Sequence, residues 1–450
     1  AASPRESHLF HTFHNPYDDD YTSTSPNRPT TITPPTVDAR HGRTSFHARL
    51  TPCPRVQARP TTRHTQHVLR KAGAVKFRVE RDVLADAVAW AARTLPARPA
   101  LPVLAGLVLS VNDEVLTLSS FDYEVSARVE VPCDVDAPGV ALVSGRLLSD
   151  IARSLPAQPV TLSVEGTRVV ITCGRSSFTL PTLPVEDYPQ LPVMPQGSGE
   201  IKGSLFATAV GQVAIAAGRD DTLPTLTGIR LEIEGTRLVL AATDRYRLAV
   251  REFDWNPLST GLTAHALIPA RTLADTAKAL ASSDVMSIAL APPGAGEGLI
   301  GFEGNGRRTT TRLLDGEFPK YRTLLPNEAA SIALVETAML AEAVKRVSLV
   351  AERNTPVRLT FDGSEVVLRA GVGDDAQANE AVEATVDGDA LEIAFNPNYL
   401  LDGLAAIDSP IARFSFTQAT RPAVLTGLAD VSATPSDEYR YLLMPVRLTG

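Results

Sequence analysis

Three short stretches of the chain follow one pattern, and this pattern decides how the rest of the sequence is interpreted. They are Leu84-Ala-Asp-Ala-Val88, Phe206-Ala-Thr-Ala-Val210 and Leu340-Ala-Glu-Ala-Val344. Their apolar residues recur three and four positions apart, which is typical of the buried face of an amphipathic helix. The stretches lie roughly 125 residues apart, and self-similarity at a fixed period indicates an internal repeat.

A second helix-like stretch recurs with a similar period. It reads RLLSD at 146–150, RTLAD at 271–275 and NYLLD at 398–402. Strand-like segments recur at 107–111, 229–233 and 357–361, and each is followed by a turn and another strand. Every repeat therefore reads β-α-β-β-β twice. We expect an α+β fold of three tandem domains, each with two helices packed on antiparallel sheets.

Composition sets the outer limits of this interpretation. The 450 residues are 44% apolar and 21% charged, which favours a globular chain over a disordered one. No apolar run reaches about 18 residues, so no membrane span is expected. The three Cys form no C-x-x-C pair, so we expect no disulfide framework and no thiolate zinc site, and we expect a cytoplasmic location. The expected domain limits are 75–197, 198–326 and 327–450.

Residues 1–74 differ from the rest of the chain. They contain 9 Arg and 1 Lys against 5 acidic residues, and 7 of the 8 His, whereas residues 75–450 contain 33 basic and 46 acidic residues. They show no sustained helical or strand period, so a packed core is not expected there. The spacing of the His residues fits no strong metal-ligand pattern. We interpret 1–74 as a disordered or mis-assigned N-terminal extension.

Motifs of enzymatic chemistry are missing from the body of the sequence. It contains no G-x-x-x-x-G-K-[ST] loop for phosphate and no G-x-S-x-G nucleophile elbow. The Gly-rich run 294–298 is interpreted as a hairpin loop, and His265 as a structural residue. Cys133 and Cys173 are expected to be buried apolar groups.

Asp244 is the one acidic residue that invites a catalytic interpretation. It stands beside Arg245 and close to Arg247, so it is either a catalytic acid or part of a structural ion pair or turn. The second interpretation is favoured, because the neighbouring cations suffice to explain a paired carboxylate. We expect no catalytic residue, no bound metal and no cofactor.

Four motifs occur in order in the body: ATDRYRLAV at 242–250, LDGEFPKY at 314–321, FNPNY at 395–399 and LMPVRL at 443–448. With the repeated plan, they make residues 76–448 resemble the bacterial DNA polymerase III beta subunit family, the sliding clamps. The resemblance implies a head-to-tail homodimeric ring around double-stranded DNA, with helices lining the channel. It also implies a non-catalytic processivity factor. Its implied partners are the DNA polymerase III alpha subunit, the clamp loader and other proteins with a clamp-binding motif, and no membrane.

The resemblance implies functional residues, matched position by position. The basic residues implied to face DNA are Arg98, Arg146, Arg153, Arg219, Arg271, Lys278 and Arg346. A hydrophobic peptide pocket is implied at Leu226, Thr243, Arg245, Tyr246, Leu248, Pro319, Leu324, Leu442, Met444, Pro445, Val446 and Arg447. The dimer contact is implied at Arg175, Phe178 and Leu180 of one chain and at Leu349 and Val350 of the other. Arg245-Tyr246 stands where many family members carry Gly-His, so a bulkier pocket is expected.

Other interpretations stay open at this point. The pocket and interface residues could be ordinary core residues, and the basic residues could be a solvated helix face. The chain could be a peptide-binding repeat scaffold that does not encircle DNA, or an enzyme of an unrecognised kind. Helix spacing favours a ring of two chains, because twelve packed helices leave a hole of roughly 22–28 Å whereas six leave roughly 5–9 Å.

Overall fold

The computed structural model describes residues 75–291, 298–326, 328–351, 355–371 and 376–447. The predicted extension 1–74 and residues 294–297 of the predicted Gly-rich loop lie outside these ranges. Within the described ranges, no helix combines the length and the apolar character of a membrane span.

The described part of the chain contains six α-helices, two in each repeat. The first helices of the repeats are α1 (Arg81–Ala91), α3 (Gly203–Ala214) and α5 (Thr337–Val347), and the second are α2 (Gly145–Ser154), α4 (Ala270–Leu280) and α6 (Pro397–Ile407). Helix α1 buries Leu84, Ala87, Val88 and Ala91, which share one face because they are three and four residues apart. Both predicted sets of helices are confirmed.

The strands surround the helices in the predicted order. The first repeat contains β1 (Lys76–Val79), β2 (Gly106–Asn112), β3 (Val115–Phe121), β4 (Val125–Pro132), β5 (Asp134–Ala137), β6 (Gly139–Ser144), β7 (Val160–Glu165), β8 (Arg168–Cys173) and β9 (Ser176–Leu183). The second contains β10 (Gly199–Ile201), β11 (Gly228–Glu234), β12 (Arg237–Thr243), β13 (Arg247–Asp254), β14 (Asn256–Pro257), β15 (Thr263–Pro269), β16 (Met286–Leu290), β17 (Leu299–Gly304) and β18 (Arg307–Arg312). The third contains β19 (Ser331–Glu336), β20 (Val357–Asp362), β21 (Glu365–Ala370), β22 (Ala378–Asp387), β23 (Leu391–Phe395), β24 (Ile411–Phe416), β25 (Ala423–Leu428) and β26 (Tyr439–Leu443).

The strands form two large antiparallel sheets that run from one repeat into the next. One sheet has 14 strands in the order β14-β10-β16-β17-β18-β4-β3-β2-β6-β9-β8-β7-β1-β5, and the other has 12 strands in the order β15-β11-β12-β13-β26-β25-β24-β19-β22-β21-β20-β23. Strand β18 of the second repeat pairs with β4 of the first, and β26 of the third pairs with β13 of the second. These two pairings are called the first and second junctions below.

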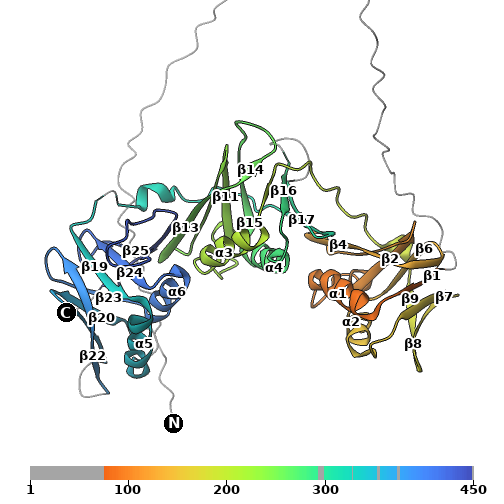
Figure 1. The fold of residues 1–450 in the computed structure, drawn as a ribbon, viewed down its shortest axis with the longest axis horizontal. Helices are drawn as coiled ribbons and strands as arrows, with labels where there is room; N and C mark the ends of the chain where they lie inside the picture. The colour runs from red at the N-terminus through yellow and green to blue at the C-terminus, as the bar shows by residue number, and fades with distance from the viewer. Residues whose placement is uncertain (1–74, 292–297, 327, 352–354, 372–375, 448–450) are drawn as a thin grey trace, which may run out of the picture. The chain divides into compact units, whose positions relative to one another are not determined.

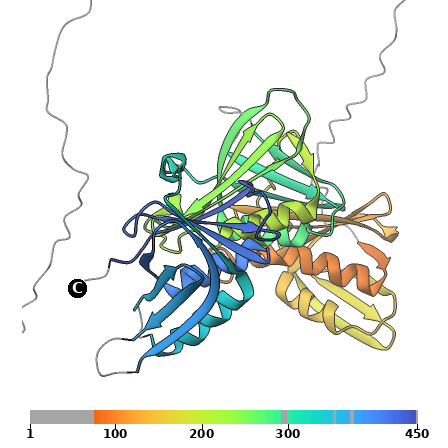
Figure 2. The ribbon, with the colours of Figure 1, turned by 60° about the vertical axis from the view of Figure 1, so that its left-hand side comes forward.

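In each repeat the two helices lie side by side against the strands (Figure 1, Figure 2). The rings of Phe206 on α3 and Phe302 on β17 lie 5.7 Å apart at the centre of the second repeat. Cys133 and Cys173 are buried, as predicted. His265 lies on β15 with its side chain exposed, so it is not a core residue. The fold is the predicted α+β architecture of three similar domains.

Candidate functional site

The turn between β12 and β13 is held by the carboxylate of Asp244. Its Oδ1 accepts hydrogen bonds from the backbone N–H groups of Tyr246 and Arg247, each 3.0 Å long. Arg245, which directly follows Asp244, has a φ of 78°, a left-handed conformation that few residues other than Gly adopt easily. The hydroxyl of Thr243 donates to the carbonyl of Arg247 over 2.7 Å and closes the turn. These bonds fix the side chains of Arg245 and Tyr246 at the surface.

The guanidinium of Arg247 joins the second repeat to the third. It is 5% exposed, and its Nε lies 2.9 Å from Asp244 Oδ2 while its Nη1 lies 2.6 Å from Asp402 Oδ2 on α6. It also lies 4.3 Å from the centre of the Tyr399 ring, a cation–π contact. Burial acts to lower the pKa of Arg247, but the hydrogen bond to Asp402 and the charge of Asp244 outweigh it and raise that pKa. The predicted structural role of Asp244 is confirmed.

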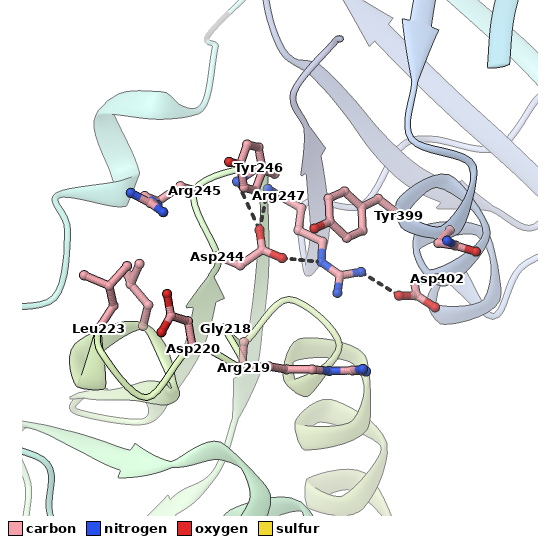
Figure 3. A pocket seen from close by; sticks show the side chains of 13 residues that line it. Gly218, Arg219, Asp220, Leu223, Asp244, Arg245, Tyr246, Arg247, Tyr399 and Asp402 are labelled. Carbon is pink, nitrogen blue, oxygen red and sulfur yellow. Dashed lines mark hydrogen bonds and ion pairs between the residues drawn. The ribbon is translucent and has the colours of Figure 1, made fainter. Parts of the chain in front are cut away.

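A hollow of about 750 Å³ opens beside this ion pair (Figure 3). Its walls are the segment after α3, the β12–β13 turn and the first turns of α6. It is lined by Ala217, Gly218, Arg219, Asp220, Leu223, Leu226, Asp244, Arg245, Tyr246, Arg247, Asn398, Tyr399 and Asp402. Three Arg and three Asp line it, so its charges balance. The rings of Tyr246 and Tyr399 stack with centres 6.3 Å apart.

An apolar cluster lies behind the turn. Leu248 on β13 and Leu442 on β26 face each other in the strand register and are both buried. Phe318 and Tyr321, from the segment between the second and third repeats, pack on the same cluster. The strand pairing continues past β26, because Met444 N–H donates to the carbonyl of Tyr246 over 2.9 Å. This bond places the exposed side chain of Met444 next to the turn.

Three family models match the body of the chain in order. They are the N-terminal domain of the DNA polymerase III beta subunit at residues 75–192, its central domain at 200–320 and its C-terminal domain at 322–447. The chain belongs to the DNA polymerase III beta subunit family. Membership of this family gives it the function of a DNA sliding clamp, a processivity factor of DNA replication that has no catalytic activity of its own.

Individual relatives agree with the family models. The chain is 62% identical over 376 residues to the beta sliding clamp of Streptomyces coelicolor, which covers 84% of this chain and all of that protein. It is 51% identical to the beta sliding clamp of Micrococcus luteus, over 70% of this chain and all of that protein.

Solved structures show the same fold. The crystal structure of the DNA polymerase sliding clamp from Bacillus subtilis matches with a TM-score of 0.78 and 26% identity, over 84% of this chain and all of that chain. A sliding clamp from Pseudomonas aeruginosa bound to griselimycin matches with a TM-score of 0.76 and 28% identity, over the same shares of the two chains. The resemblance that the sequence motifs indicate is thereby confirmed.

The residues that the family resemblance assigns to the peptide pocket fall into three groups. Leu226, Arg245 and Tyr246 line the hollow. Thr243, Leu248 and Leu442 are buried behind it. Pro319, Leu324, Met444, Pro445, Val446 and Arg447 are exposed or half-buried and do not line it, and Pro319 lines a separate pocket together with His265. Their role in peptide binding stays a prediction.

Among the lining residues that sequence reasoning did not assign to the pocket are Arg247, Tyr399 and Asp402. Each lies within one of the motifs quoted from the sequence, so the motifs contained these residues but did not show that they lie together. The missing information was spatial, because Arg247 and Asp402 are far apart in the chain.

The basic residues assigned to DNA binding are all exposed. Arg146 and Arg153 lie on α2, Arg271 and Lys278 on α4, Arg346 on α5, and Arg98 and Arg219 in segments that follow a helix. Two of them already have acidic partners. Arg346 Nη2 lies 2.5 Å from Glu380 on β22, and Arg153 Nη2 lies 2.6 Å from Asp150 on its own helix. These two charges are therefore partly neutralised within the chain.

The residues assigned to dimer contact differ in exposure. Leu349 is 84% exposed, Arg175 is exposed, and Phe178 and Val350 are half-buried. Leu180 is 1% exposed and belongs to the main hydrophobic core. Its side chain points inward because β9 alternates and residue 180 falls on the core face. Leu180 is thus a core residue, and its side chain is not available for a contact with a second chain.

Proposed function

We propose that the chain forms a head-to-tail homodimeric ring that encircles double-stranded DNA. The ring holds the DNA polymerase III alpha subunit, the clamp loader and other proteins that carry a clamp-binding motif, and it works in the cytoplasm. The domain limits proposed for it are 75–197, 198–326 and 327–450. The main support for this proposal is that two strand edges remain unpaired, among the described residues, after the two junctions have formed.

Each junction joins one strand of the first half of a repeat to one strand of the second half of the next repeat. These are β4 with β18 at the first junction and β13 with β26 at the second. The internal repeat makes β22 the counterpart of β4 and β13, and β9 the counterpart of β18 and β26. Within the described residues, 378–383 of β22 pair only with β21, and 176–181 of β9 pair only with β8.

These two edges support a third junction between two chains. An unpaired strand edge is a template for pairing with another chain. A contact of β9 in one chain with β22 in another is head-to-tail, and such contacts close into a ring when the rotation permits. The half-buried Phe178 lies on β9, and the exposed Leu349 follows α5, a helix that packs against β22. Closure after two chains accounts for the twelve helices that a hole wide enough for a duplex requires.

Exposed bases on the helices support DNA binding without sequence preference. Residues 75–450 contain 33 basic and 46 acidic residues, so the body as a whole repels DNA at long range. The exposed basic residues on α2 and α4 are a local exception to this excess of acidic residues. Lys and Arg contacts to phosphate position a protein on DNA but carry no sequence information. Weak, unspecific contacts of this kind allow sliding.

The hollow at the second junction supports peptide binding. Its wall includes the fixed polar turn. Next to that turn lie the apolar cluster of Leu248 and Leu442 and the soft, exposed side chain of Met444, a combination that suits several related segments. Arg245 and Tyr246 make one wall bulky, as expected from the sequence.

A peptide titration tests the pocket. A labelled Gln-Leu-x-Leu-Phe peptide is added to the full chain, to Met444→Asp and to the exposed-surface control Val431→Asp. We expect saturable binding in the wild type and the control, and affinity at least about tenfold lower in Met444→Asp, because a carboxylate faces the apolar segment. Equal affinity in all three proteins would refute this assignment of the pocket.

A repeat scaffold that binds peptides without encircling DNA is the alternative. It predicts peptide binding but no dependence of DNA retention on whether the DNA is circular. That comparison therefore separates the two functions.

A further inference from the structure

The internal repeat also indicates which side chains meet at the proposed third junction, between β9 of one chain and β22 of another. We propose that Arg346 on α5 fastens this junction by donating a hydrogen bond to the backbone carbonyl of Ser154 of the partner subunit, at the end of α2. The proposal rests on the head-to-tail ring proposed above and names a residue that holds it closed. It gives Arg346 a role besides the DNA contact that the family resemblance implies.

At the second junction, one residue of the first helix makes a bond of this kind. Gln212 on α3 donates from Nε2 to the carbonyl of Ala406, in the last turn of α6, over 2.8 Å. The hydroxyl of Tyr439 on β26 donates to the carbonyl of Gln212 over 3.1 Å. Position 212 thus ties the second repeat to both a helix and a strand of the third.

The helices of the repeats align residue by residue. The helix motifs quoted from the sequence place Trp90, Gln212 and Arg346 at one and the same position of α1, α3 and α5. The buried residues of α2 and α6 align in the same way, so Ser154 is the equivalent of Ala406. By this alignment, Arg346 and Ser154 stand in the places of the donor and the acceptor that the second junction shows.

The strand residue at the third junction leaves room for the long side chain of Arg346. Arg307 of β18 and Tyr439 of β26 are the strand residues that contact this helix position at the first and second junctions. The strand registers make Ser176 of β9 their equivalent, and they place it opposite Glu380 of β22. Ser176 is short where the other two are long. Arg346 therefore has space to extend over it towards α2 of the partner subunit.

The guanidinium of Arg346 has donors left for this bond. Its Nε lies 3.1 Å and its Nη2 lies 2.5 Å from carboxylate oxygens of Glu380. A guanidinium carries five N–H donors in a planar fork, so within the described residues its Nη1 group remains for another acceptor, and the side chain is 55% exposed. The ion pair holds the side chain in place, which lowers the entropy lost when two chains meet. Ser154 is exposed, and the last carbonyls of a helix attract cations.

Dissociation of the dimer tests the proposal. The fluorescently labelled full chain is diluted in steps, and the dissociation constant of the dimer is measured by sedimentation. Every variant carries Glu380→Gln, so that the loss of Arg346 leaves no unpaired carboxylate at the contact. In this background we expect Arg346→Met to raise the dissociation constant at least about tenfold, because each ring loses two charge-assisted hydrogen bonds. Arg346→Gln is expected to recover part of this loss, since it supplies the amide donor that Gln212 supplies at the second junction.

The matched control is Lys345→Met, which removes an exposed cation from the neighbouring position of the same helix. We expect its dissociation constant to equal that of the Glu380→Gln parent. If Arg346→Met also equals the parent, the contact with Ser154 is overturned and the ring is left intact. An equal loss in Lys345→Met, or no recovery in Arg346→Gln, overturns the hydrogen bond as well. A wild-type chain that is monomeric at every concentration overturns the proposed ring and this contact together.

Discussion

At the scale of single residues, the ion pair of Arg247 with Asp402 is a direct link between the second and third repeats. Arg247 is buried and Asp402 is 45% exposed, so the replacement Asp402→Asn leaves a buried cation with one carboxylate in place of two. We expect the free energy of unfolding to fall by about 1–2 kcal/mol, the lower range for a hydrogen bond to a charged group that is partly solvated. Urea denaturation measures this change.

The matched control is Asp437→Asn, which removes one charge from an exposed loop residue. It is expected to leave the unfolding midpoint within the error of the wild type. If the two variants unfold at the same urea concentration, the pair contributes nothing to the stability of the second junction.

Tyr188 predicts how stability depends on alkaline pH. Its hydroxyl accepts from Phe121 N–H over 2.7 Å, and burial raises its pKa to about 12 although the bond to the Phe121 backbone acts to lower it. The folded state keeps this proton when the unfolded chain loses it above pH 10. The contribution of Tyr188 to the free energy of unfolding is thus fully present below pH 10 and is lost as the pH rises towards 12. Tyr188→Phe is expected to flatten this decline in pH-dependent unfolding, and an identical decline in the exposed-residue control Tyr123→Phe and in Tyr188→Phe would contradict it.

Residue types and their immediate neighbours were predictable where the interaction is local. The pairing of Asp244 with Arg247 follows from three positions of spacing, and the burial of Cys133 and Cys173 follows from the general tendency of free Cys to be buried. The contact of Arg247 with Asp402 was not predictable, because it depends on how α6 packs against the β12–β13 turn. Leu180 was assigned to an interface because an apolar strand residue gives the same sequence pattern whether it faces a core or a second chain.

At the scale of elements, the proposed dimer depends on the unpaired edges of β9 and β22. Leu349 is 84% exposed, so Leu349→Asp is expected to leave each chain folded while it places a charge in the contact between chains. Light scattering after size exclusion is expected to show a dimer for the wild type and a monomer for the variant. The control Met339→Asp changes an exposed residue of α5 and is expected to stay dimeric. A dimeric Leu349→Asp would refute the proposed edge contact.

The proposed DNA binding depends on exposed basic residues on the helices and in the segments that follow them. The triple variant Arg98/Arg146/Arg271→Ala removes three exposed bases, and we expect the slope of log affinity against log salt to fall by about three units. The control Arg168/Arg358/Arg421→Ala makes the same charge change on strands β8 and β20 and in a loop. Fluorescence anisotropy with duplex DNA over a salt series measures both. An unchanged slope in the first variant, or an equal change in the two, would exclude these residues from phosphate contact.

The elements themselves were largely predictable, since the apolar spacing of the helices and the alternation of the strands recur in each repeat. The order β-α-β-β-β is observed twice per repeat. The pairings β4–β18 and β13–β26 were not predictable, because pairing partners between repeats are set by tertiary packing rather than by local pattern. The short strands β5 and β14 were not predicted for the same reason, since each is defined only by its neighbour in the sheet.

At the scale of the whole molecule, function follows from topology and not from reactive groups. The family supplies the sliding-clamp function, and the chain adds unpaired strand edges, exposed basic residues and a hollow at its second junction. A closed ring holds DNA by enclosure, so tight contacts to the bases are unnecessary. This explains why an acidic body is compatible with a DNA-bound protein.

Enclosure of DNA by the ring depends on whether the DNA is a closed circle. The chain is loaded onto a nicked circular plasmid with a bacterial clamp loader and ATP, and the complex is isolated by gel filtration. We predict that the protein stays with the circle at a salt concentration that dissociates ordinary phosphate contacts, and that a single double-strand cut releases it. Equal retention on circular and cut DNA would contradict enclosure and would favour a scaffold that binds DNA only along its surface.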